Sequence, residues 1–89
     1  MKQAQKFYKE MGGVFRLFRI YTLKMTLEEL GGKSLISSLS NFENGKLVRY
    51  NYFFLYIRAC KSEDQVQKLI KLVGQIMFNA YKRGEMYDG

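Results

Sequence analysis

The sequence predicts an all-α domain of five helices, with a helix-turn-helix at its centre and a long amphipathic helix at its C-terminal end. The 89 residues contain no proline, which suits a chain of helices joined by tight connections. Two segments, Thr26–Glu29 and Ser62–Gln65, match the capping box that starts many helices. Apolar residues recur at three- and four-residue steps through most of the chain, which is typical of helices with one buried face.

The first helix is predicted from Phe7 to Lys24, because large apolar residues recur there at helical spacing. Gly12–Gly13 lowers the helix propensity in its middle. The two glycines either divide a short leading helix from the next one or let another helix pack closely. Arg16 and Arg19 fall on one side of the helix, where we expect a solvated face rather than phosphate contacts.

The central helix-turn-helix is predicted from residue 26 to residue 44. Thr26 caps a helix of barely two turns, which Gly31 and Gly32 end because glycine adopts a positive φ at little cost. Ser34 is then expected to cap a second helix that runs to about Asn44, with Gly45 after its end. Its apolar residues at i, i+4 and i+7 form one inner face and are Leu35, Leu39 and Phe42.

The segment Leu39–Lys46, with the sequence LSNFENGK, resembles the end of the recognition helix in the Cro/repressor-like (XRE) helix-turn-helix family. It is most similar to the Rgg/MutR branch, which carries Leu-Ser-Arg-Phe-Glu-Arg-Gly there. GVFR at residues 13–16, Arg19 and TLEEL at residues 26–30 extend the resemblance, which covers roughly residues 12–60. The family often has arginine where Asn41 and Asn44 stand, and a large helical-repeat domain follows the helix-turn-helix in Rgg-type proteins.

This resemblance implies a lambda-repressor-like fold and a recognition helix that enters the major groove of DNA. The residues that it implies as base contacts are Leu35, Ile36, Ser37, Ser38 and Asn41. Phosphate contacts are expected from the residues that flank or support this helix, namely Lys33, Ser40, Lys46 and Arg49.

Two further helices are predicted after the helix-turn-helix. The fourth runs from Tyr50 to Cys60, with Asn51 as a possible cap and an inner face made of Phe53, Phe54, Ile57 and Cys60. Ser62 opens the fifth, which ends near Arg83 and carries the clearest apolar stripe of the chain. We therefore expect a helix-turn-helix region at 1–61 and a C-terminal helix at 62–89 within one structural domain.

The C-terminal helix is predicted to form a homodimer, because its stripe extends past what so small a domain can cover. The residues expected in that interface are Leu69, Ile70, Val73, Ile76 and Met77. The competing account folds this helix back over the first and fourth helices, as a lid on the core of a monomer.

The composition favours binding over catalysis. The net charge of +7 favours an acidic partner such as nucleic acid. The chain has no histidine, one cysteine (Cys60) and no glycine-rich phosphate loop, so we expect neither an enzyme nor a cofactor or metal site. No apolar run approaches the length of a membrane span and the N-terminus does not resemble a signal peptide, so a cytoplasmic location is expected.

The favoured function is sequence-specific binding of double-stranded DNA by a small transcriptional regulator, such as a phage or mobile-element repressor. The alternative is a protein that uses the same scaffold to bind another protein, as an antirepressor or an inhibitor of a host complex would. This alternative stays open because residues 35–44 contain neither lysine nor arginine and begin with two aliphatic residues.

Overall fold

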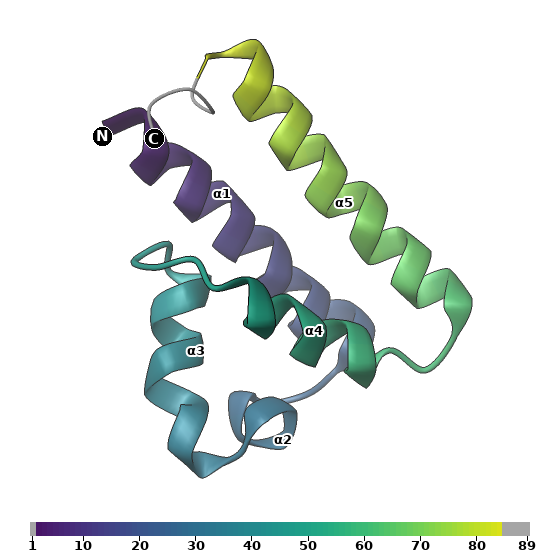
Figure 1. Cartoon of the computed structure of the whole chain (residues 1–89). Coiled ribbons are helices and arrows are strands. Elements are labelled where there is room, and N and C mark those ends of the chain that lie inside the picture. The colour runs from purple at the N-terminus through teal and green to yellow at the C-terminus, as the bar shows by residue number, and fades with distance from the viewer. Residues whose placement is uncertain (1, 85–89) are drawn as a thin grey trace.

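The computed structural model of the chain describes residues 2–84, and over that range every regular element is a helix. The predicted all-α class with five α-helices and a long C-terminal helix is confirmed (Figure 1). The helices are α1 (Lys2–Leu17), α2 (Leu27–Gly31), α3 (Ile36–Glu43), α4 (Tyr50–Ala59) and α5 (Glu63–Lys82). The predicted C-terminal segment 62–89 is described as far as residue 84, and residues 85–89 lie outside the described range.

The glycine pair at residues 12 and 13 does not divide the first helix, because α1 runs through it without interruption. A Cβ atom on Gly12 would lie 2.6 Å from the carbonyl oxygen of Glu43, so the end of α3 packs directly on the backbone of α1. Of the two alternatives, close helix packing is therefore the correct one. The helix then widens into a π-helix at Phe18–Leu23 and ends at Lys24, whose φ of 56° is left-handed.

The capping box predicted at the start of α2 is confirmed. The backbone N–H of Glu29 donates to the Thr26 hydroxyl at 3.1 Å, and the backbone N–H of Thr26 donates to the Glu29 carboxylate at 2.8 Å. Gly32 follows with a φ of +86°, as the predicted turn requires. α2 and α3 pack against each other. A short turn joins them, as expected (Figure 1).

The predicted cap of the second helix is wrong. Residues Lys33–Leu35 form a short 3₁₀ turn, α3 begins only at Ile36, and no side chain caps it. At the other end, Gly45 follows the helix with a φ of +80°, as expected. A Cβ atom there would lie 2.6 Å from the Cα atom of Lys9, so this glycine also lets the loop approach α1 closely.

Aromatic rings from three helices form the core. The Phe15 ring on α1 lies 5.2 Å from that of Phe42 on α3 and 4.7 Å from that of Tyr56 on α4. Leu39 and Phe42 are fully buried, as the inner face of the second helix predicts.

Of the four residues predicted on the inner face of α4, three pack partly buried against the core, as expected, namely Phe53, Ile57 and Cys60. Phe54 is misplaced, and the sequence pattern missed the two most deeply buried residues of this helix. Its buried residues are Tyr52 and Tyr56, whereas Phe54, placed inside by the sequence pattern, is 59% exposed. The two tyrosines are four residues apart and so lie on one face of the helix, while Phe54, between them, points elsewhere. An α4 segment with seven large apolar residues among ten fits several rotations, and packing on α3 selects one of them.

α5 lies along α1, on the side of α1 away from α3 (Figure 1). Leu69 is 1% exposed, and Val73 and Ile76 pack partly buried against the same core. These three residues of the predicted dimer interface therefore belong to the core of the single chain, as the lid account requires, because a core this small recruits every inward-facing apolar side chain. At the C-terminal end of α5, an ion pair between Arg83 and Glu10 at 2.7 Å also joins this part of the chain to α1.

Candidate nucleic-acid interface

A buried network on the inner side of α3 fixes the position of this helix. It consists of an ion pair between Arg19 and Glu43 and a hydrogen bond from Tyr56. Arg19 binds the Glu43 carboxylate through two parallel hydrogen bonds, from Nε at 2.8 Å and from Nη2 at 2.9 Å. The Tyr56 hydroxyl donates to the same carboxylate at 2.8 Å. The network thus joins the π-helix, the last turn of α3 and the middle of α4 through one carboxylate.

Every nitrogen of the Arg19 guanidinium and both oxygens of the Glu43 carboxylate have a hydrogen-bond partner. The remaining Arg19 nitrogen, Nη1, donates to the backbone carbonyl of Met25 at 2.8 Å, which also anchors the turn before α2. The hydrogen bonds and the charge of Glu43 raise the pKa of Arg19 against the opposing effect of burial. Burial, with the adjacent Glu43 charge, raises the pKa of the Tyr56 hydroxyl far above its ordinary value. The tyrosine therefore stays a donor throughout the physiological pH range.

The sequence contained a signal for this network that the prediction missed. Arg19 lies four residues after Phe15, and Glu43 lies four residues after Leu39, so each charged residue stands on the buried face of its own helix. Two charges of opposite sign on buried faces can only be accommodated as a pair. The prediction of a solvated Arg19 is therefore wrong, because the arginine is 9% exposed and is used structurally.

The outer face of α3 is polar and carries no charge. Ser37, Asn41 and Asn44 succeed one another at i, i+4 and i+7, opposite the buried Leu39, and form one line along the helix. Ser37 and Asn44 are exposed and Asn41 is half-buried. Asn44, which the sequence did not nominate as a contact, belongs to this face, and its amide donates weakly to Ser40 Oγ at 3.5 Å.

The other predicted base contacts lie at the edges of this face. Ile36 and Ser38 are half-buried on its two sides. Leu35 belongs to the 3₁₀ turn, packs against the core and contacts the Gly31 position, so its side chain is used to hold α2 and α3 together. This packing matches the inner-face position that the spacing of Leu35, Leu39 and Phe42 predicts.

Basic side chains stand at both ends of the outer face. Lys33 is exposed just before α3, and Lys46 and Arg49 are exposed in the loop after it. Lys9 of α1, also exposed, lies beside that loop because its backbone contacts Gly45. The acidic residue of α3 itself, Glu43, is buried and paired with Arg19, so it does not oppose this positive charge at the surface.

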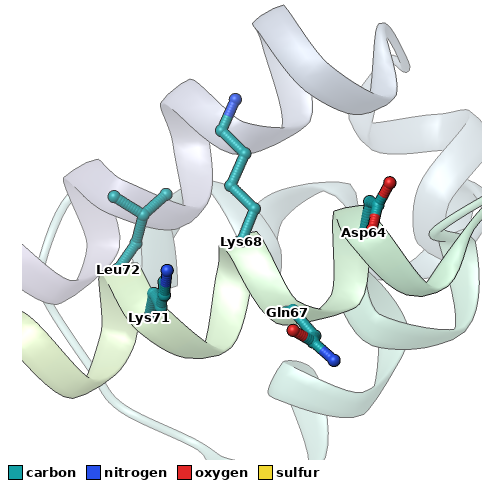
Figure 2. A pocket seen from close by; sticks show the side chains of 5 residues that line it. All are labelled: Asp64, Gln67, Lys68, Lys71 and Leu72. Carbon is teal, nitrogen blue, oxygen red and sulfur yellow. The ribbon is translucent and has the colours of Figure 1, made fainter.

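Two hollows of the surface lie away from this face, on and beside α5. The larger, of about 400 Å³, is open and is bordered by side chains of one helix: Asp64, Gln67, Lys68, Lys71 and Leu72 (Figure 2). Lys68 points from it towards α1 and donates a hydrogen bond to the Thr22 hydroxyl at 3.2 Å. A second, of about 260 Å³, lies between α5 and the π-helix and is mainly apolar.

Two further features of the described residues concern other kinds of site. Within residues 2–84, no three histidine, cysteine, aspartate or glutamate side chains are grouped so that they could hold a metal ion. None of the helices in that range has the length and apolar character needed to cross a membrane.

Comparisons of the chain with protein-family models, with curated proteins and with solved structures found no match. The resemblance to the Cro/repressor-like family therefore stays a prediction.

Proposed function

We propose that this protein is a small cytoplasmic regulator of transcription that binds specific sequences of double-stranded DNA through the outer face of α3. The observation that carries the proposal is the arrangement of that helix. Its polar face of Ser37, Asn41 and Asn44 is open, while its other side is fixed by the ion-pair network and by close packing on Gly12. A reading helix must present its side chains in a defined register, which a rigid support supplies.

Each part of this face has a chemical role in the proposal. The Asn41 amide can bind adenine through two hydrogen bonds, and the hydroxyls of Ser37 and Ser38 can donate to or accept from several bases. Ile36 supplies an apolar contact for the methyl group of thymine. Lys33, Lys46 and Arg49, at the two ends of α3, contact phosphates and set its position in the groove, with Ser40 beside them.

The decisive experiment is selection from a random DNA library with the purified chain. We expect enrichment of a short motif that contains adenine. The control is the double variant Ser37→Ala/Asn41→Ala, which removes two outward-facing side chains and keeps the core, and which should no longer enrich the motif. Failure of the wild-type chain to enrich any sequence would remove the proposal.

The alternative, binding to another protein, is favoured by one observation. The smaller hollow is lined by Val14, Leu17, Phe18, Tyr21 and Leu72, of which Leu17 is 56% exposed and Tyr21 71% exposed. Exposed apolar side chains beside a groove are common in protein-binding surfaces. Binding to DNA should weaken steeply with added salt through release of counterions, whereas an apolar contact should not.

The proposal also includes a homodimer, since two copies related by a two-fold axis can place two α3 helices on successive major grooves. Of the five predicted interface residues, Leu69, Val73 and Ile76 are packed within the chain, and Ile70 and Met77 stay available at 57% and 41% exposure. Of the predicted interface residues, only these two are therefore left to contribute to a dimer surface on α5.

A further inference from the structure

One side of α5 carries exposed apolar side chains that no other helix covers within residues 2–84. We define the Gly74 face as Ile70, Gly74, Met77 and Phe78, which lie at i, i+4, i+7 and i+8 and so share one side of the helix. Ile70 is 57% exposed, Met77 41% and Phe78 55%. Figure 1 shows α5 at the edge of the molecule with α1 as its neighbour, and the residues that pack on that neighbour, such as Leu69 and Ala80, lie on a different side of the helix.

Gly74 is the feature of this face that the single chain does not explain. A glycine in the interior of a helix lowers its stability relative to alanine. A Cβ atom at Gly74 would have no atom within 4 Å, so no packing among residues 2–84 requires the glycine. This contrasts with Gly12, where the backbone of α3 occupies the space. Three of the four surface neighbours of Gly74, at i−4, i+3 and i+4, are exposed apolar side chains, and the fourth is Lys71. A glycine in such a setting is suited to the close approach of another backbone.

The charges of α5 indicate what kind of helix could approach. Its first turn is acidic, with Glu63 and Asp64, and its last turn is basic, with Lys82. A second α5 in antiparallel orientation places the acidic turn of each helix near the basic turn of the other, and also aligns the helix dipoles favourably. A parallel copy would bring like charges together.

We propose that the Gly74 face binds a second copy of this chain, with the two α5 helices antiparallel and crossing at Gly74. In that arrangement Ile70 packs on Phe78 of the partner subunit, because the two positions are equally far, about 6 Å along the axis, from the crossing point. Symmetry repeats the contact on the other side of Gly74. The Lys82 ammonium, which lies 5.2 Å from the centre of the Phe78 ring, borders this contact.

This inference deepens the proposed function, since it rests on the part of that proposal in which two copies act together. The half-exposed side chains of the Gly74 face supply roughly 300 Å² of apolar surface from each copy, on the scale of about 150–250 Å² for a whole aromatic side chain. This is less than the roughly 800 Å² per partner of a standard interface. We therefore expect a weak, transient dimer that forms only towards the upper end of the concentration range from micromolar to near-millimolar.

The test is sedimentation equilibrium of the full chain without DNA, over concentrations from micromolar to near-millimolar. The wild-type protein should shift from the 10.5 kDa of one chain towards twice that mass. Gly74→Gln places a side chain of high helix propensity into open space in the single chain but into the path of the second helix. Its thermal unfolding should therefore move to higher temperature while its self-association weakens by about tenfold or more.

The matched control is Gly13→Gln. Gly13 is also a helical glycine with no atom within 4 Å of a Cβ, but it lies on α1. The Gly13→Gln substitution should raise the unfolding temperature as Gly74→Gln does, but it should leave self-association unchanged. A wild-type chain that stays monomeric at all concentrations, or a Gly74→Gln chain that dimerises as the wild type does, would overturn the proposal.

Failure of the dimer and failure of DNA binding are distinguishable, because the sedimentation experiment contains no DNA. A monomeric wild-type chain that still selects a single half-site from the DNA library would remove the dimer alone. A chain that dimerises through Gly74 and selects no sequence would support this interface and remove the proposed function.

Discussion

Glu43 is the single residue on which most of the architecture depends. Its side chain is 4% exposed, and its carboxylate accepts hydrogen bonds from Arg19 Nε, Arg19 Nη2 and the Tyr56 hydroxyl. Burial of an ion pair contributes little net stability, since the loss of hydration offsets the attraction between the charges. The use of this pair is rather to specify one position of α3 relative to α1 and α4, because any other position would leave a buried charge without a partner.

Replacing Glu43 by alanine should therefore cost about 3–5 kcal/mol of unfolding free energy, because it leaves the Arg19 guanidinium buried and unpaired. Urea unfolding of the purified variant measures this loss. Glu29→Ala is the comparison, since Glu29 is exposed and only completes the capping box of α2, and it should cost about 1 kcal/mol or less. Equal losses in the two variants would show that the network does not hold α3.

The raised pKa of Tyr56 predicts that the unfolding free energy falls at alkaline pH. Its pKa is raised in the folded chain by burial and by the Glu43 charge, so folding favours the protonated hydroxyl. This contribution is complete below the ordinary tyrosine pKa of about 10 and is lost as the pH rises above it, at about 1.4 kcal/mol per pH unit. Urea unfolding between pH 9 and 11, measured for the wild type and Tyr56→Phe, isolates it, because the variant lacks this proton. Parallel slopes for the two proteins would contradict the assignment.

Asn41 is the residue expected to carry the most sequence information. Asn41→Ala should weaken binding to the selected motif by roughly 1–3 kcal/mol and relax the preference at one base pair, since a bidentate contact to adenine is lost. Affinities for the motif and for its single-base variants measure both effects. Asn51→Ala is the control, because that asparagine is exposed but belongs to α4 and not to the predicted reading face of α3. An Asn41→Ala chain with unchanged preference at every position would show that α3 does not read bases.

At the scale of elements, the contact between α1 and α3 depends on the absence of a side chain at Gly12. A methyl group there would meet the backbone carbonyl of Glu43, which cannot move without displacing α3 and the ion-pair network. The neighbouring Gly13 has open space around it. The two glycines are adjacent in the sequence, but only Gly13 has room for a side chain.

Gly12→Ala should accordingly lower the unfolding free energy by about 1–3 kcal/mol through overpacking. Gly13→Ala should raise it by up to about 1 kcal/mol, because alanine is the better helix former. Thermal unfolding of the two variants compares them directly. Two equally stabilised proteins would mean that α3 does not approach α1 as closely as the structure shows.

At the scale of the whole molecule, the chain has a net charge of +7, and part of this positive charge lies at the two ends of α3. DNA binding through this face should therefore weaken as the salt concentration rises. If Lys33, Lys46 and Arg49 each contact a phosphate, the logarithm of the association constant should fall against the logarithm of salt concentration with a slope of about −2.7. Lys46→Ala should bring that slope nearer zero by about one and weaken all sequences alike. Lys68→Ala, on α5 and bonded to Thr22, should leave the slope unchanged. Equal effects of the two substitutions would place the phosphate contacts elsewhere.

The sequence by itself determined the features that depend on neighbours along the chain. The all-α class, the Thr26 capping box, the left-handed glycines after α2 and α3 and the burial of Leu39 and Phe42 all follow from spacing of three to seven residues. Capping and helical periodicity act within two turns, so local sequence is sufficient to specify them.

Only the tertiary structure decided which of several possible faces each helix buries. α4 could bury Phe54 as well as Tyr52 or Tyr56, and the choice came from packing on α3. In the same way, the sequence pattern allowed Leu69 of α5 to face either a second chain or the core of its own chain. It packs into the core, because a short chain needs every inward-facing apolar side chain to form one. The pairing of Arg19 with Glu43 joins residues 24 apart, and a match at that distance depends on how three helices pack together, which no local pattern encodes.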